Sequence, residues 1–368
     1  MPLELPATTK DITVEWLNEV LHENGFLGSS NIISLKHAQI GIGEGMTSDI
    51  ARISLSYDNA SKQLPTTIVA KLPAVSEPAR TRCLRTGVYA REVQVYKKII
   101  PSSPIRTPDC YFSDMNPENE KFVLLLEDCA KYSQPDYEQN GISYEQAKTI
   151  ALAIAEFHAR WWDDTKLLNY SMLRQPTDTL SENGINLFRM LWETCSARKD
   201  FKQYLPEGGF EVSKLQYDNY HLLIDSNPKD KLTITHSDLR ADNVFIDDYN
   251  DEQPVIVYDW AMAMVWRGVA DISFLLGTSV DTDLRRNIEK DLIQQYHNRL
   301  IECGVMNYSF DECWEDYLKG YLWFTGNTLA CFGLSDRSSA RGEKRAIQGI
   351  ERWFSAIIDN DAISLLPN

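Results

Sequence analysis

Hydrophobic and polar positions divide the chain into two regions with different periodicities. From about residue 31 to residue 128, short runs rich in β-branched residues recur, among them NIISLKHAQI, IARISLSY, TTIVAKLP, DCYFSD and KFVLLLED. Runs of this length and composition are typical of β-strands. After about residue 140 apolar residues recur three or four positions apart, which predicts amphipathic helices. The pattern therefore predicts a β-rich first part and a mainly helical second part.

Several helices can be placed along this pattern. The stretch DITVEWLNEVLHENGFLG carries an apolar face and ends at Gly25, while TGVYAREVQVYKKII places one helix, near 86–100, inside the β-rich region. In ISYEQAKTIALAIAEFHARWW, Ser143 and Gln146 have the spacing of a capping box. Further helices are expected near 182–224, 282–303 and 311–330.

One compact β-like segment interrupts the helical region. It reads KLTITHSDLRADNVFIDDYNDEQPVIVYDWAMA, with β-like runs on both sides of a polar motif. A chain of 368 residues exceeds the usual size of one compact domain. We therefore expect an α+β protein of two lobes, with residues 1–128 forming the first lobe and residues 129–368 the second.

Composition and charge exclude several classes of function. A formal net charge of −16 argues against binding nucleic acid through its phosphates, which requires a basic surface. No run of 18 or more apolar residues is present, and the N-terminal stretch lacks the order of a signal peptide, so neither a membrane span nor export is expected. The seven cysteines form no C-x-x-C pair, which suits reduced thiols in the cytoplasm.

Three oxygen-bearing side chains are the candidates for chemistry. Asp238 and Asn243 lie five residues apart in ITHSDLRADNVFIDD, and Asp259 ends the strand-like run VIVYD. Mg²⁺ prefers hard oxygen ligands and keeps several waters, so part of this set could hold the ion while one aspartate deprotonates a hydroxyl. Each residue alone could equally be a turn former or a helix cap.

The motif HSDLRADNVFID followed by VYDW resembles the catalytic loop and metal-binding aspartate of the protein-kinase-like superfamily, in its small-molecule branch. This branch holds aminoglycoside phosphotransferases, choline kinases and ecdysteroid-kinase-like enzymes. The resemblance implies a bilobal fold that uses ATP and Mg²⁺. It makes Asp238 the catalytic base and Asn243 and Asp259 the metal ligands.

The resemblance also requires a glycine-rich hairpin near the start of the sheet. IGIGEGMTSDIARISL offers Gly41, Gly43 and Gly45, which permit close approach of backbone to phosphate, with Thr47 and Ser48 as further donors. By itself this stretch is as compatible with a plain turn.

A lysine and a glutamate are the next expected pair. Lys71 lies within the β-like run TTIVAKLPAV, where a lysine needs an anionic partner unless it faces solvent from an edge strand. Glu92, 21 positions later in REVQVYKKI, is the implied partner. Because Arg91 and Lys97 accompany it, a solvated helix face is the alternative for Glu92.

The hinge and the support of the catalytic loop complete the set. The run KFVLLLED leads into Glu127, Asp128 and Cys129, and the resemblance implies that their peptide groups bind the nucleotide base. In WRGVADISFLL, Asp271 resembles the aspartate that braces the catalytic loop, with a helix N-cap as the alternative. His158, in EFHARWW, is expected on the helix behind that loop.

Two departures from the family pattern affect the function. Ser237 replaces the usual glycine of the loop, and Arg240 follows the base by two residues. Arg240 could stabilise the transferring phosphoryl group as a catalytic residue, or pair with a nearby carboxylate. Asp271 follows Trp260 by only eleven positions, which leaves no room for a long activation loop and disfavours a protein substrate.

The acceptor is less constrained by the sequence. Acceptor pockets in this branch lie in helical insertions, which implies residues of about 165–225 and 300–355 here. The second insertion contains DECWEDYLKGYLWFTGNTLACFG, whose aromatic residues are usual core formers but could line a pocket for a ring-bearing alcohol. The negative charge would equally favour a cationic acceptor such as an amino sugar.

These observations predict a kinase that transfers the γ-phosphoryl group of ATP to a hydroxyl of a small molecule, such as an aminoglycoside-like, sterol-like or other alcohol. The alternatives are a nucleotide-binding pseudokinase with a regulatory role, and a kinase of a hydroxyacyl or N-hydroxy metabolite. The sequence leaves open the acceptor, ATP against GTP, the oligomeric state and the biological role.

Overall fold

The protein is described by a computed structural model over residues 4–41, 47–59, 64–135, 141–179, 181–334 and 340–367. The chain divides into two compact units. The first comprises Met1–Ser102, Arg106–Tyr132 and Val257–Ala261, and the second comprises Ser103–Ile105, Ser133–Ile256 and Met262–Asn368. The first unit therefore extends four residues beyond the expected boundary at 128. It also includes a later segment of the chain, Val257–Ala261, here called the chain return.

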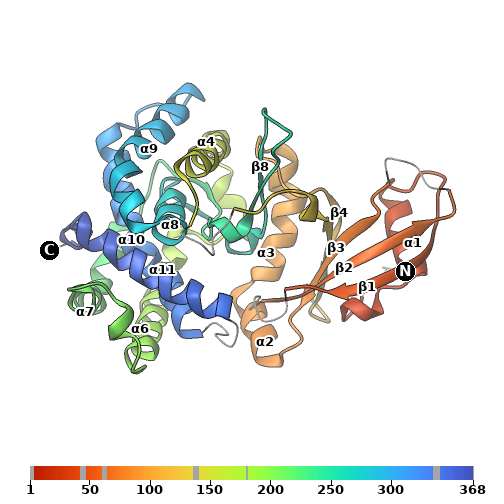
Figure 1. The fold of residues 1–368 in the computed structure, drawn as a ribbon, viewed down its shortest axis with the longest axis horizontal. Helices are drawn as coiled ribbons and strands as arrows, with labels where there is room; N and C mark the ends of the chain where they lie inside the picture. Colours follow the sequence, from red (N-terminus) through yellow and green to blue (C-terminus); the bar gives the residue numbers. More distant parts are fainter. Residues whose placement is uncertain are drawn as a thin grey trace. The chain divides into compact units, whose positions relative to one another are not determined.

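The first unit is built on a five-stranded antiparallel sheet with the strand order β1-β2-β3-β5-β4 (Figure 1). The five strands expected from the β-branched runs are all present. The elements of this unit are β1 (Ile32–Gln39), β2 (Ser48–Tyr57), β3 (Thr67–Pro73), β4 (Cys110–Asn116), β5 (Lys121–Glu127), α1 (Val14–Glu23), α2 (Glu77–Thr86) and α3 (Val88–Gln94).

Helix α1 covers part of this sheet, next to β1 and β4. It buries Leu17, Val20 and Leu21, which join the strand residues in one core cluster. Thr13 caps its N-terminus by accepting a hydrogen bond from the Trp16 N–H at 3.2 Å. Gly25 has a φ of 76° just beyond the last turn, a conformation that favours glycine. The helix predicted to end at Gly25 is thus confirmed.

The helical region before β4 differs from the prediction in two ways. A separate helix, α2, precedes the expected one, and Gly87 between them has a left-handed φ of 69°. Because α2 buries only Cys83, it has no apolar stripe that the sequence could reveal. In addition, α3 continues into a π-helical turn, η2 (Val95–Ile99), before the chain reaches β4.

The second unit is mainly helical, with short strand pairs β6–β9 and β7–β8. Its elements are α4 (Tyr144–Arg160), α5 (Pro176–Thr179), α6 (Glu182–Ser196), α7 (Gly209–Asn219), β6 (Thr233–Thr235), β7 (Val244–Ile246), β8 (Val255–Val257, whose last residue enters the first unit), β9 (Met264–Trp266), α8 (Ala270–Ser279), α9 (Thr282–Glu302), α10 (Phe310–Leu334) and α11 (Ala340–Asp359). The capping box of Ser143 and Gln146 is present at the start of α4.

Helix α8 is the centre of this unit. All ten of its residues are buried, and it contacts α4, α9, α10 and α11 (Figure 1). Close packing is possible because α10 presents Gly320 to α8, where an added methyl group would overlap the Ser273 hydroxyl and lie 3.2 Å from the Ala270 Cα. The fully buried α8 therefore forms a rigid support for the segments that precede it.

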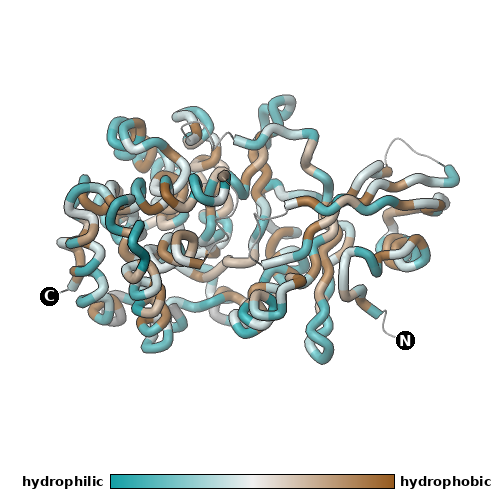
Figure 2. Tube along the Cα trace, turned by 60° about the horizontal axis from the view of Figure 1, so that its bottom comes forward, coloured by the Kyte–Doolittle hydropathy of each residue, from teal (hydrophilic) through white to brown (hydrophobic). Residues whose placement is uncertain are grey.

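Hydrophilic and hydrophobic residues alternate along the helices and strands of both units (Figure 2). Among the described residues, no helix combines the length and the apolar character that crossing a bilayer requires.

The seven cysteines are all free thiols, which agrees with the reduced thiols predicted from their spacing.

Two glycine substitutions test the packing against α8. Gly320→Ala is expected to lower the free energy of unfolding by about 1–3 kcal/mol, because the methyl group overpacks the contact with Ser273. Gly349→Ala on α11, where no atom lies within 4 Å of the added carbon, is the control and is expected to raise it by about 0.4–1 kcal/mol. Urea denaturation measures both, and equal effects would contradict the packing account.

Candidate active site

A buried lysine shared by two carboxylates forms the polar centre of the first unit. Lys71 lies in the interior of β3, opposite Ile50 of β2 and Leu124 of β5, and is 7% exposed. Its Nζ is 2.8 Å from the Glu92 carboxylate of α3 and 2.8 Å from Asp259 Oδ1. Glu92 is 1% exposed. The solvent-facing alternatives for both residues are therefore wrong.

The charges of this cluster depend on one another. Burial alone would lower the pKa of Lys71, but the negative charges of Asp259 and Glu92 outweigh it and raise the pKa, so the ammonium form is secured. Burial raises the pKa of Glu92 to about 7, against the opposing effect of Lys71. A cation fixed in this way is suited to binding an anion that approaches from outside the pair.

The chain return Val257–Ala261 places Asp259 beside Lys71. Its Val257 N–H donates to Arg106 O at 3.0 Å, and Arg91 Nη1 donates to Ala261 O at 2.7 Å. Arg91 is buried rather than solvated. Asp259 itself has a φ of 62°, a left-handed conformation that is costly for a residue other than glycine.

The predicted phosphate loop is described in part. Gly41 has a φ of 68°, whereas Gly43 and Gly45 lie outside the described residues. The Thr47 carbonyl accepts a hydrogen bond from the Tyr89 hydroxyl at 2.6 Å, and Ser48 begins β2. The hydroxyl groups of Thr47 and Ser48 are 3.5 Å apart. The described end of this loop thus leads into β2, which is the neighbour of β3, the strand that carries Lys71.

The hinge residues follow β5 directly. The Glu127 N–H donates to Asp109 O at 2.8 Å. Asp128 is held by Arg52, whose Nε is 2.6 Å from Oδ2, and it also accepts from the Ala130 N–H at 3.2 Å. Cys129 is buried. The side chains of Asp128 and Cys129 are thus engaged in contacts within the protein.

In the second unit, Asp271 braces the loop that carries Asp238. This fully buried carboxylate accepts hydrogen bonds from the His236 N–H at 2.7 Å and from the Ser237 N–H at 2.8 Å. The Asp271 side chain does not cap α8, because the N-cap position is Val269. The bracing interpretation is confirmed, and the N-cap alternative is wrong.

A second layer holds Asp271 in place. His158 of α4 is fully buried, with Nε2 3.2 Å from Asp271 Oδ2 and Nδ1 2.8 Å from the Tyr296 hydroxyl. A methyl group at Gly268 would come within 2.8 Å of both His158 Nδ1 and the Tyr296 hydroxyl. His158 thus packs behind the loop as expected, and only glycine fits beside it.

The loop presents Asp238 and Asn243 together. Asn243 Nδ2 donates to Asp238 O at 2.8 Å and to Asp238 Oδ2 at 3.0 Å, and the Asp238 N–H donates to His236 Nδ1 at 3.2 Å. Both side-chain contacts of Asn243 use its amide nitrogen and not its amide oxygen. Ser237 has a φ of 62°, which accounts for the glycine that the family pattern usually has there.

Arg240 contacts two carboxylates, as one of its two interpretations, pairing with a nearby carboxylate, predicted. Its Nε is 3.4 Å from Asp238 Oδ1, and its Nη1 is 3.6 Å from Asp242 Oδ2. Asp242 also lies 3.4 Å from Arg341 and 3.8 Å from Arg345 of α11. These two arginines could not be predicted from the sequence, because a separation of about 100 residues from Asp242 leaves no local signal.

Each unit offers one oxygen donor of the kind that Mg²⁺ prefers. Asp259 carries a carboxylate in the first unit and Asn243 an amide oxygen in the second, and Mg²⁺ is usually bound by one or two such groups plus phosphates and water. Among the residues that the structure describes, no cluster of three or more histidine, cysteine, aspartate or glutamate side chains could hold a metal. Each of the two donors, taken by itself, has the chemistry of a Mg²⁺ ligand.

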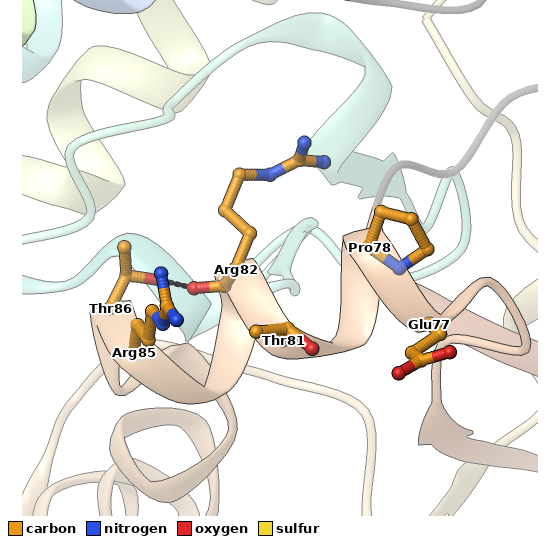
Figure 3. Close-up of a pocket in the computed structure, with 6 residues that line it drawn as sticks. All are labelled: Glu77, Pro78, Thr81, Arg82, Arg85 and Thr86. Carbon is orange, nitrogen blue, oxygen red and sulfur yellow. Dashed lines mark hydrogen bonds between the residues drawn. The ribbon is translucent and has the colours of Figure 1, made fainter.

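Pockets lie near these elements in both units. One pocket of the second unit includes Ser237, next to Asp238, together with Phe188, Tyr220 and Trp323. Another pocket of the same unit includes Arg240 and Arg345. The pocket of the first unit follows α2 and is lined by residues of that helix alone, with the Thr86 hydroxyl donating to Arg82 O (Figure 3). The α2 pocket contains none of the predicted site residues.

Comparison with known proteins identifies relatives of this chain. The sequence model of the ecdysteroid kinase-like family matches residues 42–306. No curated protein matches the chain.

Solved structures match over nearly the whole chain. A spectinomycin phosphotransferase in complex with ADP and spectinomycin has a TM-score of 0.54 and 14% identity, covering 95% of this chain and 99% of its own. The GDP complex of an aminoglycoside 2'-phosphotransferase has a TM-score of 0.53 and 14% identity, covering 95% and 100%. A microcompartment-associated aminopropanol kinase has a TM-score of 0.52 and 11% identity, covering 90% and 94%. At these identities the likeness concerns the fold, and it confirms the protein-kinase-like fold class.

The brace formed by Asp271 can be tested by substitution. Asp271→Asn puts an NH₂ group where an oxygen now accepts a backbone N–H, so we expect the free energy of unfolding to fall by about 1–3 kcal/mol. Asp248→Asn, at an exposed position, is the control and should change it by less than about 0.5 kcal/mol. Chemical denaturation measures both, and an unchanged stability of Asp271→Asn would contradict the brace.

Proposed function

The chain belongs to the ecdysteroid kinase-like family, and we propose that it transfers the γ-phosphoryl group of ATP, with Mg²⁺, to a hydroxyl of a small molecule. The observation that carries this proposal is the buried Lys71 ammonium held between Glu92 and Asp259, each at 2.8 Å. A buried lysine kept charged in this way is the usual means by which the kinase-like fold holds phosphate groups.

The first unit supplies the nucleotide-binding residues. Lys71 contacts the phosphates and Glu92 keeps it in position. The glycine loop, with Gly41, Gly43, Gly45, Thr47 and Ser48, offers backbone and hydroxyl donors to the same phosphates. The peptide groups of residues 127–129 bind the base. Similar structures contain ADP or GDP, so the choice of ATP is our expectation from the family.

The catalytic residues follow the same logic. Asp238 accepts the proton of the acceptor hydroxyl, which makes its oxygen a better nucleophile. Asn243 and Asp259 would hold the Mg²⁺ ion, which neutralises charge on the phosphates. Arg240, placed beside Asp238, stabilises the charge of the transferring group. We place this activity in the cytoplasm, in agreement with the free thiols.

Phosphate transfer should be measured directly. The purified protein, incubated with ATP, Mg²⁺ and a panel of ring-bearing, sugar and short-chain alcohols, should release ADP and add phosphate to at least one alcohol. A nucleotide-binding pseudokinase would bind ATP and release no acceptor-dependent ADP. If only hydroxyacyl or N-hydroxy compounds gained phosphate, the protein would be a kinase of that substrate class instead.

Asp238→Asn should fold normally and lose most of its turnover. Because the amide cannot accept the proton, we expect kcat to fall by about 10²–10⁴-fold, whereas the Kd for a non-hydrolysable ATP analogue stays within a few-fold. Asp248→Asn, with the same change at an exposed position, should keep wild-type turnover. Wild-type kcat in Asp238→Asn would refute the assignment of the base.

Lys71→Met should affect stability and nucleotide binding separately. Leaving Glu92 buried without its cation should cost about 3–5 kcal/mol of folding free energy. Adding Glu92→Leu to Lys71→Met should recover much of that stability and none of the nucleotide affinity. Lys97→Met, which breaks an exposed pair with Asp114, should change stability by no more than about 1 kcal/mol. Recovery of ATP affinity in the double variant would contradict the role of Lys71.

A further inference from the structure

The pocket beside the catalytic loop, here called the Arg174 pocket, lies entirely within the second unit. Residues from several separate parts of the chain line it, and those used below are Arg174, Phe188, Tyr220, Ser237, Trp323 and Asn327. Ser237 immediately precedes Asp238, and its carbonyl accepts a hydrogen bond from Asn327 Nδ2 at 3.1 Å. A molecule bound in this pocket therefore lies against Ser237, the residue that precedes the proposed base in the sequence.

Aromatic rings form much of the pocket wall. Phe188 and Tyr220 stack with ring centroids 3.8 Å apart and planes inclined by 7°. The Tyr220 hydroxyl donates to Trp323 O at 3.3 Å, which fixes its ring between two helices. Rigid, stacked rings bind flat apolar groups at a low cost in conformational entropy. The wall favours a ligand that contains rings.

Arg174 introduces a positive charge at this wall. Its backbone is tied to β9, where the Val265 N–H donates to Arg174 O at 2.9 Å. Within the described part of the chain, its guanidinium makes neither a hydrogen bond nor an ion pair. The nearest acidic influence is Asp178, whose carboxylate accepts from the Gln175 N–H at 2.8 Å. Burial lowers the pKa of Arg174, as it does for a charge without close compensation.

Trp323 provides a second donor that lacks an acceptor. The residue is 3% exposed, and its indole Nε1 is buried without a hydrogen-bond partner among the described residues. Buried tryptophan N–H groups usually have a partner, because an unpaired donor costs about 1–3 kcal/mol. Arg174 and Trp323 thus line the same pocket, and each has hydrogen-bonding capacity that the described protein does not fill.

The lining contains no acidic residue to satisfy these donors. The solvent-exposed carboxylates that contribute to the net charge of −16 act only weakly on these donors, because salt screens exposed charges beyond about 8 Å at physiological ionic strength. Within the pocket lining, a cationic amino sugar would meet Arg174 and no carboxylate. The chemistry that the pocket lacks is an anionic oxygen acceptor.

We propose that the Arg174 pocket binds an acceptor that joins an apolar ring system to a carboxylate or a similar anionic group, which Arg174 and the Trp323 N–H hold. The proposal rests on the proposed function in that the ring-bearing molecule also carries the hydroxyl that is phosphorylated. Arg174 is then a specificity-determining residue, and an arginine is well suited to a planar, two-oxygen group.

Direct binding tests this proposal without any turnover. The probes are sets of three compounds on a common scaffold of one to four rings, and every compound bears a hydroxymethyl group. Within a set, the compounds differ in one further group, which is a carboxylate, its methyl ester or an aminomethyl group. The smallest acid is 4-(hydroxymethyl)benzoate. Calorimetry on the full-length protein should show that, on the scaffold that binds best, the acid binds about ten- to hundredfold more tightly than the ester and the amine.

Three variants connect that preference to the pocket. Arg174→Gln should remove the preference for the acid, and Trp323→Phe, which keeps the ring and removes the donor, should reduce it. Arg189→Gln removes the same charge from α6 without touching the pocket lining and should leave the preference unchanged. Without ligand, Arg174→Gln should have an unfolding temperature equal to or above that of the wild type, because the side chain makes no bond that is lost.

The outcomes separate this inference from the proposed function. Acid-selective binding that depends on Arg174, together with an absence of phosphate transfer, would refute the kinase and keep the inference. Phosphorylation of neutral or cationic alcohols with no gain from an anionic group would refute the inference and keep the kinase. Failure of every acid to bind more tightly than its ester, or an unchanged preference in Arg174→Gln, would also overturn the inference.

Discussion

The loop that carries Asp238 and Asn243 depends on one buried carboxylate. Asp271 accepts the backbone N–H groups of His236 and Ser237 with its two oxygens, and His158 contacts it from behind. Because α8, which carries Asp271, is buried along its whole length, the carboxylate has a fixed position. The loop is therefore held through the backbone N–H groups of His236 and Ser237, and this attachment does not use the Asp238 and Asn243 side chains, to which we assign the chemistry as a proposal. One aspartate thus holds the loop through two backbone hydrogen bonds, where several side-chain contacts would otherwise be needed.

Much of the fold follows from local sequence signals. The β-branched runs predicted the five strands of the sheet, and the apolar periodicity of residues 282–303 predicted α9, which spans Thr282–Glu302. Helix α2 was missed because its only buried side chain is Cys83, so tertiary position, not an apolar stripe, determines it. The π-helical turn after α3 likewise leaves no mark in the spacing of its residues.

The candidate site was predictable to the extent that its residues form motifs. Lys71 and Glu92 were expected as a pair, and their contact at 2.8 Å agrees with that, although their role in binding nucleotide is a proposal. Arg341 and Arg345 near Asp242 were not predictable, since contacts between residues about 100 positions apart carry no pattern. Arg174 was missed for a related reason: it lies in a polar loop, and only the packing of α6 and α10 around it makes its charge unusual.

The return of the chain through Val257–Ala261 has a consequence for how the protein could be divided. A polypeptide that stopped after Tyr132 would contain every strand of the large sheet and still lack Asp259, one of the two anions that neutralise the Lys71 ammonium. The first unit is thus not a module that could be transplanted or inherited as a single stretch of gene. Shuffling of the two halves between related proteins would have to preserve a five-residue segment encoded more than a hundred codons downstream.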